Sequence, residues 1–440
     1  MRAPVVCVQN LGCRVNRVES DAIVSALVAE GFCVGEAAEA DLVVVNTCAV
    51  TGEAEAKTRK AVRRALALPR APHVVVTGCA VNLHPGELAA LSERVVEEPA
   101  KAAVARRARE LLAPAGGLEP APSPAPAAPP TEFLGRSRLG VKIQDGCNNR
   151  CSYCIVWKAR GRERSEPAEA VLEQVRRAAA GGVPEVVLTG VNLAAYRAAD
   201  GGGAGTGLEG LLARILAETD IRQVRLSSLE PMDLRPALLE LMAASDGRIA
   251  PYLHLPLQAG STATLRRMRR PYTAEEYERL AARCRELVPG VAISCDVIVG
   301  FPGETEDEFA ETRALCERVG FSKMHVFRYS ARPGTPAATA PDQVPPPVMA
   351  ARSAELRALA AEMTRSDAAR RVGTVERAVI EDGARATLGS FHRVLIDGAV
   401  PEGARAAGIV ELAIIGQDSE GLLHGRPVGE DGARGARAGR

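Results

Sequence analysis

The sequence predicts an α/β protein with two regions, because apolar strand-like runs alternate with helical patterns along most of its 440 residues. In the first region such runs lie at residues 4–9, 41–47 and 73–78. In the second region a strand and a helix recur roughly every 30–45 residues, a period typical of βα units. Between them the segment APAGGLEPAPSPAPAAPP is rich in proline and alanine, which favours an extended spacer. We therefore expect an open parallel sheet, a linker and a partial (β/α)6 barrel.

Three cysteines follow the three strands expected in the first region. Cys13, Cys48 and Cys79 each stand just past the carboxyl end of one of these strands. The carboxyl ends of parallel strands share one edge of an open sheet, and ligands bind at that edge. The three thiols could therefore converge on one ligand, or each could be a small apolar side chain buried separately. Their spacing in the sequence leaves both interpretations open.

The second region is expected to contain six strands, at residues 139–144, 185–189, 223–227, 252–255, 292–299 and 323–329. Pro167 suits the first turn of a helix, and the pair Gly181-Gly182 suits a helix end. In a parallel barrel the chemistry lies at the carboxyl ends of the strands. The loops there include LTGVNL, SSLEP and VGFPGET. Gly190 and Gly300 in two of these loops could also serve only as turn residues.

The loop after the first of these six strands, IQDGCNNRCSYCIV, has the spacing C-x3-C-x2-C at Cys147, Cys151 and Cys154. A structural zinc ion takes four ligands, usually from two separate pairs. Disulfides fit poorly, because eleven cysteines is an odd number and no N-terminal apolar run marks the chain for export. A [4Fe–4S] cluster held by three cysteines keeps one iron free for another ligand. We interpret the loop as a cluster site, with zinc or three unconnected thiols as the alternatives.

Composition gives no sign of a particular partner. The 55 Lys+Arg residues balance 54 Asp+Glu residues, so a nucleic-acid site would have to be local. The basic runs KTRKAVRR and GARGARAGR could contact phosphates, or they could be a solvated helix face and a tail without function. Apolar runs are too short to cross a bilayer. We therefore expect a cytoplasmic protein that has no membrane contact.

Seven segments carry a resemblance to a known family. QDGCNNRCSYC resembles the signature of the radical S-adenosylmethionine (SAM) enzymes, and IVGFPGET resembles their loop near the adenine. Together with LGCRVNRVES, VVVNTCAVTGEAEAKTRK, VVVTGCAV, RLSSLEPMD and LHLPLQAGSTATLRRMRRPYT, they resemble the methylthiotransferases over about residues 5–365, and most of all the MtaB-type tRNA branch. Residues 365–428 resemble the small TRAM β-barrel in position and in strand-rich pattern.

The resemblance implies an order of domains. Residues 1–112 would form an N-terminal domain with an auxiliary cluster, and residues 113–131 a linker. Residues 132–364 would form the radical SAM core, residues 365–428 a TRAM-like barrel, and residues 429–440 a basic tail.

The resemblance also implies two [4Fe–4S] clusters and SAM as cofactors. One cluster would be held by Cys147, Cys151 and Cys154 and would bind SAM at its fourth iron. Reductive cleavage of SAM there gives a 5′-deoxyadenosyl radical, which is chemistry of the cofactor. The other cluster would carry sulfur and be held by Cys13, Cys48 and Cys79. In the family one SAM methylates that sulfur, and a second SAM supplies the radical.

Contacts to SAM are implied at six positions. Tyr153 would pack near the adenine, Thr189 and Gly190 would meet the methionine amine through their backbone, and Ser227 or Glu230 would reach the ribose or the carboxylate. Gly300 lies in the adenine loop. The sequence departs from the family where Trp157-Lys158 replaces a common Pro-Tyr pair and where Arg150 replaces a frequent aromatic. A third departure is LQAGS in place of Gln-Ser-Gly-Ser.

The implied reaction converts N6-threonylcarbamoyladenosine at position 37, in the anticodon stem-loop of tRNA, to its 2-methylthio derivative. It needs an electron donor such as flavodoxin or ferredoxin, and a sulfur donor that the sequence does not identify. Another modified adenosine or a ribosomal-protein aspartate is the alternative substrate. A non-catalytic iron–sulfur electron carrier or a SAM-binding regulator is the alternative of another class.

Overall fold

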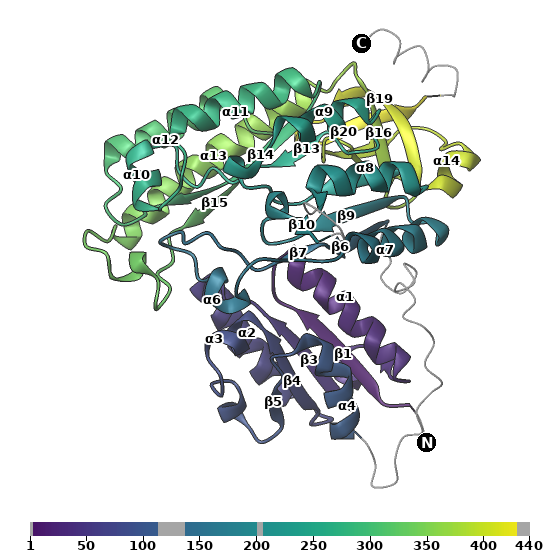
Figure 1. Ribbon diagram of the computed structural model, residues 1–440, viewed down its shortest axis with the longest axis vertical. Coiled ribbons are helices and arrows are strands. Elements are labelled where there is room, and N and C mark those ends of the chain that lie inside the picture. Colours follow the sequence, from purple (N-terminus) through teal and green to yellow (C-terminus); the bar gives the residue numbers. More distant parts are fainter. Residues whose placement is uncertain (1–2, 113–136, 200–205, 429–440) are drawn as a thin grey trace. The chain divides into compact units, whose positions relative to one another are not determined.

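The computed structural model describes residues 3–112, 137–199 and 206–428 (Figure 1). It divides into two compact units. The first comprises Met1–Leu134, Asp145–Arg164 and Ser330–Ala338, and the second comprises Gly135–Gln144, Ser165–Tyr329 and Thr339–Arg440. The expected linker at 113–131 and the tail at 429–440 lie outside the described residues.

The first unit is built on a five-stranded parallel sheet with the order β2-β1-β3-β4-β5. The expected strands are β1 (Val5–Asn10), β3 (Leu42–Thr47) and β4 (His73–Gly78), so the prediction of an N-terminal parallel sheet is confirmed. The sequence analysis missed β2 (Cys33–Val34) and β5 (Val95–Glu97), which are too short to show a periodicity.

Helices cover both faces of this sheet. Alternate residues of β3 point to opposite faces, so Leu42 and Val44 pack with α1 (Arg14–Ala29) and α4 (Val104–Leu112). Val43 and Val45 pack with α2 (Gly52–Leu66) and α3 (Cys79–Leu83). All six residues of β3 are buried, as expected for a central parallel strand. The same unit contains α6 (Val156–Arg160), which packs against α3.

The second unit contains six parallel strands that form the expected partial barrel. They are arranged as two three-stranded sheets, β12-β9-β6 and β13-β14-β15, and a parallel bridge between Ser228 and His254 links the two sheets. The strands are β6 (Arg138–Lys142), β9 (Glu185–Thr189), β12 (Gln223–Leu226), β13 (Tyr252–His254), β14 (Ala292–Val299) and β15 (Lys323–Arg328). The prediction of a partial (β/α)6 barrel is therefore confirmed.

Helices follow the strands of this barrel. They are α7 (Ala168–Ala180), α8 (Leu208–Glu218), α9 (Pro236–Ala244), α10 (Thr262–Arg267), α11 (Ala274–Leu287), α12 (Glu306–Val319) and the long α13 (Pro346–Ala369). Pro167 is the residue before α7 and Gly181 the residue after it, close to the expected ends. Short strand pairs join β7 (Gln144–Asp145) to β8 (Arg164–Ser165), and β10 (Arg197–Ala198) to β11 (Thr206–Gly207).

A closed five-stranded barrel follows α13, as expected for the C-terminal region. Its order is β16-β17-β18-β20-β19, and closure leaves no sheet edge unpaired. The elements are β16 (Val375–Ile380), β17 (Arg385–Leu388), β18 (Arg393–Ile396), α14 (Glu402–Ala407), β19 (Ile409–Gln417) and β20 (Leu423–Pro427). They enclose an apolar core of their own.

A buried ion pair joins this barrel to the strands of the second unit. Arg225 of β12 is paired with Glu185 of β9 at 2.9 Å, and both side chains are almost fully buried. The same guanidinium donates to the backbone oxygens of Leu388 and Gly389, at 3.1 and 2.8 Å. These contacts fix the C-terminal barrel to strands β9 and β12 of the same unit.

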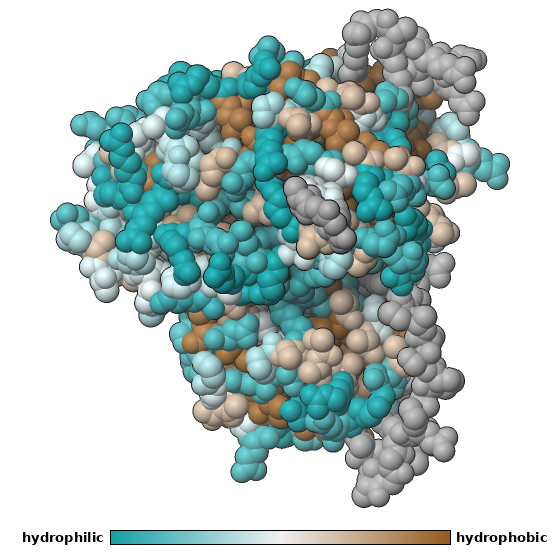
Figure 2. Space-filling model, viewed as in Figure 1, coloured by the Kyte–Doolittle hydropathy of each residue, from teal (hydrophilic) through white to brown (hydrophobic). Residues whose placement is uncertain are grey.

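The described surface carries only scattered apolar side chains. Figure 2 shows a face on which hydrophilic residues dominate and apolar ones are interspersed. None of the described helices is both long enough and apolar enough to cross a membrane. Large apolar residues exposed among the described positions are Val28, Val50, Phe327, Val348, Val372 and Ile415.

Candidate functional site

The first group of candidate ligands lies at the carboxyl edge of the N-terminal sheet. Cys13 immediately precedes α1, Cys48 directly follows β3, and Cys79 is the first residue of α3 after β4. Because β1, β3 and β4 are neighbours, the three loops lie side by side. Cys48 and Cys79 are buried and Cys13 is exposed. The structure therefore brings these three thiols, which we call the auxiliary triplet, to one edge of the sheet.

The auxiliary triplet is close enough for its members to affect one another's ionisation. Burial raises the pKa of the Cys48 and Cys79 thiols, and a negative charge on Cys13 raises both pKa values further. Thiolates in a poorly solvated place need a cation or a metal to stabilise their charge. The arrangement suits a positively charged iron–sulfur core, and ligation of such a core by the triplet remains a prediction.

Buried polar side chains fix the backbone beside the auxiliary triplet. The Asn16 amide donates to the Thr47 carbonyl at 2.6 Å, and the Asn46 amide donates to the Asn16 carbonyl at 2.9 Å. The Thr47 hydroxyl donates to the Thr77 carbonyl at 2.7 Å and accepts from the backbone N–H of Ala80 at 3.2 Å. These bonds hold the strand ends in one geometry, because a buried polar network that is fully bonded is rigid.

The second group of candidate ligands, Cys147, Cys151 and Cys154, belongs to the same compact unit. We call it the SAM-loop triplet. The loop closes on itself where the backbone N–H of Cys147 donates to the Gly161 carbonyl at 3.2 Å. Gly146 has a φ of +71°, and a Cβ there would lie 2.0 Å from the Arg162 carbonyl oxygen. Only glycine therefore fits before Cys147 without a movement of the backbone.

Neither cysteine triplet has the geometry of a site for a single metal ion. Among the described residues, no three His, Cys, Asp or Glu side chains are close enough to hold a single metal ion. In a [4Fe–4S] cluster each thiolate binds a different iron, so three thiols on separate turns or loops can serve it. That chemistry fits both triplets.

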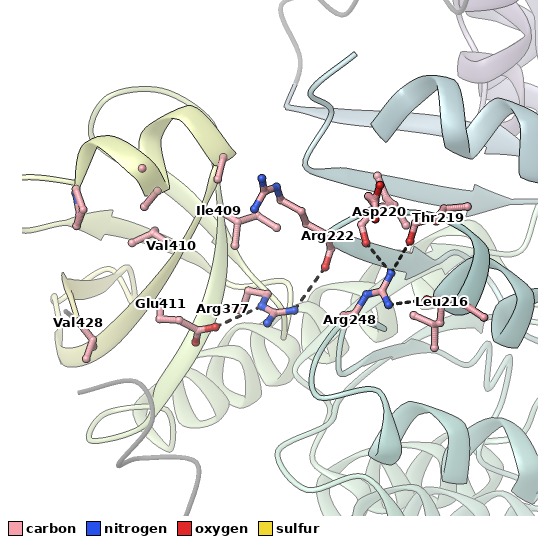
Figure 3. Close-up of a pocket in the computed structure, with 16 residues that line it drawn as sticks. Leu216, Thr219, Asp220, Arg222, Arg248, Arg377, Ile409, Val410, Glu411 and Val428 are labelled. Carbon is pink, nitrogen blue, oxygen red and sulfur yellow. Dashed lines mark hydrogen bonds and ion pairs between the residues drawn. The ribbon is translucent and has the colours of Figure 1, made fainter. Parts of the chain in front are cut away.

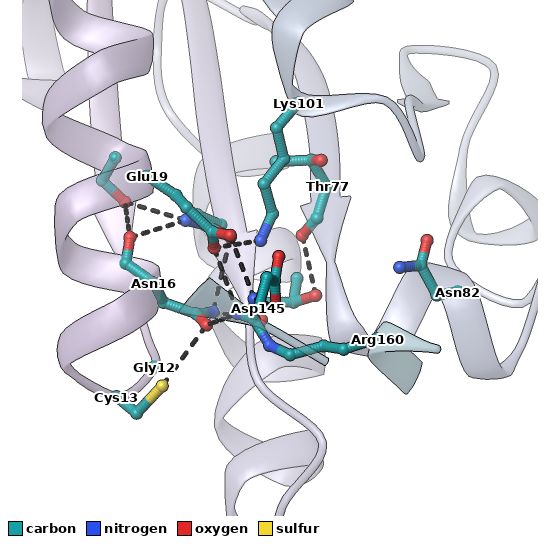
Figure 4. A network of polar contacts seen from close by, with 12 residues as sticks. Gly12, Cys13, Asn16, Glu19, Thr77, Asn82, Lys101, Asp145 and Arg160 are labelled. Atoms are coloured by element: carbon teal, nitrogen blue, oxygen red, sulfur yellow. Dashed lines mark hydrogen bonds and ion pairs between the residues drawn. The ribbon is translucent and has the colours of Figure 1, made fainter. Parts of the chain in front are cut away.

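Arg160, the last residue of α6, was not recognised in the sequence. Its side chain is 6% exposed and reaches toward Asn16, Glu19 and Asp145 (Figure 4). Nη1 donates to Glu19 and Asp145, each at 3.0 Å, and Nη2 donates to Asn16 at 2.6 Å and to Glu19 at 3.1 Å. Burial opposes its charge, but the bond to Glu19 and the nearby negative groups raise the pKa of Arg160. No spacing rule singles out this arginine.

The two departures near the SAM-loop triplet form one contact. The Arg150 guanidinium lies 4.0 Å from the centroid of the Trp157 ring, and the Lys158 ammonium lies 5.2 Å from it. Both distances allow cation–π attraction. Lys158 also donates to the Gly334 carbonyl at 2.6 Å. Arg150 and Trp157 are therefore compatible substitutions, since each packs on the other.

The second unit holds most of the residues predicted to contact SAM. Thr189 and Ser227 end or follow β9 and β12, and their buried hydroxyl oxygens have no hydrogen-bond partner. The side-chain oxygen of buried Asn192 also has none. Buried polar atoms without a partner are rare in proteins. Three of them at the carboxyl ends of neighbouring strands suit a polar ligand such as SAM.

Gly190 and Gly300 lie where other groups approach closely. A Cβ at Gly190 would lie 2.9 Å from the side chain of Gln144, whose oxygen accepts from two backbone N–H groups of the same loop. Gly300 has a φ of +72°, and a Cβ there would lie 2.1 Å from Met349 of α13. Its N–H donates to the buried Glu304 carboxylate at 2.6 Å. Both glycines are thus required by packing, whether or not they contact SAM.

Glu230 and Tyr153 are less informative. The Glu230 carboxylate forms an ion pair with Arg270, a side chain that is 1% exposed, so its charge is already balanced. Tyr153 is half-buried and belongs to the first unit, unlike the other predicted SAM contacts. Among the cysteines outside the two triplets, Cys284, Cys295 and Cys316 are buried, whereas Cys33 is exposed and Cys7 only partly buried.

A cavity of about 910 Å³ lies in the second unit between α8, α14 and β19 (Figure 3). It is lined by Thr219 to Arg222, which precede β12, so it lies at the amino end of that strand. Two of its three arginines are engaged: Arg248 donates to the Leu216, Thr219 and Ile221 carbonyls, and Arg377 pairs with Glu411 at 3.3 Å. Chemistry in parallel barrels lies at the opposite end.

Comparison with known families supports the two-part organisation. Residues 5–97 match the Uncharacterized protein family UPF0004, and residues 141–316 match the Radical SAM superfamily. These segments contain the auxiliary triplet and the SAM-loop triplet, respectively.

Curated relatives match most of the chain. The threonylcarbamoyladenosine tRNA methylthiotransferase MtaB of Treponema pallidum (strain Nichols) is 35% identical, over 81% of this chain and 86% of the relative. MtaB of Bacillus subtilis (strain 168) is 34% identical, over 87% and 86%. The tRNA-2-methylthio-N(6)-dimethylallyladenosine synthase of Novosphingobium aromaticivorans is 35% identical, over 80% and 81%.

A solved structure shares the fold. The radical S-adenosylmethionine methyltransferase TsrM from Kitasatospora setae aligns with a TM-score of 0.54 at 18% identity, over 76% of this chain and 75% of TsrM. With the curated relatives, the two cysteine triplets and the partial barrel, the assignment is clear: this chain belongs to the radical SAM methylthiotransferase family.

Proposed function

We propose that this chain is a tRNA methylthiotransferase that replaces the C2 hydrogen of N6-threonylcarbamoyladenosine, next to the anticodon, by a methylthio group. The observation that carries the proposal is the pair of cysteine triplets in one compact unit. A methylthio transfer needs both a source of radicals and a carrier of sulfur, and each triplet suits one of these tasks. The names of the Treponema pallidum and Bacillus subtilis relatives support the substrate.

Each triplet has a distinct task in this proposal. The SAM-loop triplet would hold one cluster, which would supply the electron for cleavage of SAM. The auxiliary triplet would hold the other, which would supply the sulfur. Thr189, Ser227 and Asn192 satisfy their buried oxygens on SAM. The electron comes from a flavodoxin- or ferredoxin-like protein, and the sulfur comes from a donor outside this chain.

Replacing each triplet separately tests this division. In the reconstituted protein, the Cys147→Ala, Cys151→Ala, Cys154→Ala variant should keep about half of the iron and form no 5′-deoxyadenosine from SAM under a strong reductant. The Cys13→Ala, Cys48→Ala, Cys79→Ala variant should still form 5′-deoxyadenosine but no methylthio product. Methylthio product from the second variant would contradict the division. Absence of 5′-deoxyadenosine from the unsubstituted enzyme would favour an electron carrier.

N6-dimethylallyladenosine is the second candidate substrate, because the Novosphingobium relative named for it is equally similar. The two modifications differ in chemistry, since the threonylcarbamoyl group carries a carboxylate and a hydroxyl, whereas the dimethylallyl group is apolar. A site built to hydrogen-bond polar groups rejects an analogue that lacks them by several orders of magnitude. The enzyme should therefore act strongly on only one of the two.

The substrate test presents both tRNAs to the reconstituted enzyme with SAM, sulfide and a reductant. Mass spectrometry of the nucleosides should find the 2-methylthio form of threonylcarbamoyladenosine. Product on the dimethylallyl tRNA alone would overturn the substrate assignment and keep the reaction class. A ribosomal protein incubated in parallel should stay unmodified, and methylthiolation of its aspartate with unchanged tRNA would overturn the tRNA proposal.

A further inference from the structure

We propose that Arg160 is a positioning residue that ties the two cysteine triplets together and sets the reduction potential of the cluster held by the auxiliary triplet. The proposal rests on the cluster assignment above and assigns a role to a residue that contributes no ligand. It concerns only the first unit, to which Arg160 and both triplets belong.

Each hydrogen-bond partner of Arg160 is close in sequence to one of the triplets. Asn16 and Glu19 lie in the first two turns of α1, which begins after Cys13, and Asp145 lies two residues before Cys147. Arg160 itself follows Cys154 by six residues. One guanidinium therefore joins the start of α1 to both ends of the SAM loop. Its planar fork suits such a three-way contact, because it presents several donors in fixed directions.

Asn16 carries this connection on to the other auxiliary loops. Its side-chain oxygen, which accepts from Arg160 at 2.6 Å, lies 3.6 Å from the Cys13 sulfur. Its amide donates to the carbonyl of Thr47, the residue before Cys48, at 2.6 Å. A displacement of the guanidinium would therefore reach two of the three auxiliary loops through one buried side chain.

A second contact holds α6 at the position next to Arg160. The Asn82 amide donates to the Ala159 carbonyl at 2.9 Å, and Asn82 belongs to α3, the helix that begins at Cys79. The last two residues of α6 are thus bound to the elements that carry Cys13 and Cys79. Of these two contacts, only the one made by Arg160 involves a charged side chain.

The charges around Arg160 predict the electrical part of its role. Its cation and that of Lys101 face the carboxylates of Glu19 and Asp145. The guanidinium lies close to the auxiliary triplet, because the Asn16 oxygen that accepts from it at 2.6 Å lies 3.6 Å from the Cys13 sulfur. Its positive charge therefore favours negative charge at the auxiliary triplet. A cluster gains negative charge on reduction, so a nearby cation raises its potential.

The test isolates the auxiliary cluster in the full chain with Cys147, Cys151 and Cys154 replaced by alanine. Redox titration followed by electron paramagnetic resonance then reads one cluster. Arg160→Gln should make reduction at least tenfold less favourable, which is about 59 mV for one electron. Arg160→Lys should give a smaller change, because it keeps the charge. Unchanged potential in Arg160→Gln with full iron content would overturn the proposal.

A matched control and a second variant separate this role from a structural one. Arg332 is also a buried arginine of the first unit, but it pairs with Glu55 of α2, whereas Arg160 contacts Asn16 and Glu19 beside Cys13. Arg332→Gln should leave the potential unchanged. If Arg160→Gln assembles no cluster, the test uses Glu19→Gln instead. Loss of this carboxylate should raise the reduction potential of the auxiliary cluster. No rise would overturn the proposal.

The positioning part is tested with all cysteines present. Arg160→Gln should form more 5′-deoxyadenosine per methylthio product than the parent enzyme, because the sulfur carrier is no longer held in place. An unchanged ratio would overturn the tethering role. If the parent forms no methylthio product, the proposed function has failed, whereas the potential measurement, which uses no tRNA, still decides the electrical role of Arg160.

Discussion

The close approach of two backbone segments at Gly146 predicts a specific defect. Gly146 stands directly before Cys147 at a φ of +71°, and its Cα faces the Arg162 carbonyl. We expect Gly146→Ala to displace the loop of the SAM-loop triplet and to leave the auxiliary triplet in place. The two losses that would follow are iron from one cluster and cleavage of SAM.

Two effects add up at this position. A left-handed conformation costs a residue other than glycine about 1–2 kcal/mol. The added Cβ would also lie 2.0 Å from the Arg162 oxygen and 2.8 Å from the Gly161 oxygen. Both atoms are backbone, so no side-chain rotation relieves the overlap and the loop has to move. Ligands must be held to within about 0.5 Å of their productive positions, so iron binding at Cys147 should fail.

The assay measures iron per chain and 5′-deoxyadenosine after anaerobic reconstitution. Gly146→Ala should retain about half of the parent's iron and form no 5′-deoxyadenosine. Gly182→Ala is the matched control, since Gly182 has a φ of +76° and nothing lies within 4 Å of its Cβ position. It should cost stability of about 1–2 kcal/mol from the left-handed conformation alone but keep all iron. Full iron and normal SAM cleavage in Gly146→Ala would refute the reasoning.

Three further predictions concern other parts of the molecule. Arg225→Ala leaves the buried Glu185 carboxylate without its nearest cation, with only Arg138 at 4.0 Å, so urea unfolding should show a loss of about 3–5 kcal/mol, and a loss below about 1 kcal/mol would contradict a buried pair. Burial opposes ionisation of Asp367, but His392 and nearby arginines lower its pKa overall. The ionised carboxylate therefore stabilises the fold above the unfolded-state pKa of about 3.9, and this contribution is lost as the pH falls below that value. In Asp367→Asn the free energy of unfolding should therefore fall less steeply at acid pH than in the parent protein, and an equally steep fall would argue against the ion pair. Trp157 is the sole tryptophan of the chain, so Arg150→Ala should shift its emission to the red and increase quenching by acrylamide, while an unchanged spectrum would mean that the stack does not form in solution.

The buried pair at Arg225 also bears on how tRNA binding is tested. Deletion of the C-terminal barrel would remove the Leu388 and Gly389 carbonyls that accept from this arginine. The remaining unit would then expose an ion pair that is otherwise buried. Substitutions of exposed cations on the barrel are therefore the cleaner test of whether it contacts tRNA, because the loss of a phosphate contact would lower the salt dependence of binding without opening the interior.

The sequence predicted the elements that have strong local signals. β1, β3 and β4 are apolar runs, and the six barrel strands recur with the period of βα units, so all nine were predicted and the structure contains them. The spacing of Cys147, Cys151 and Cys154 is likewise local, since eight consecutive residues hold all three thiols. By contrast, β2 and β5 have two and three residues and owe their conformation to the neighbouring strands.

Tertiary structure decided which distant residues act together. Arg160 and Glu19 are 141 positions apart, and Arg225 and Gly389 are 164 apart. No periodicity or motif encodes such pairs, because each depends on how whole elements pack. The sequence by itself determined the two sets of thiols and the alternation of strands and helices. Only folding placed both sets in one compact unit, with a buried arginine between their loops, since burial and charge pairing are properties of the packed chain.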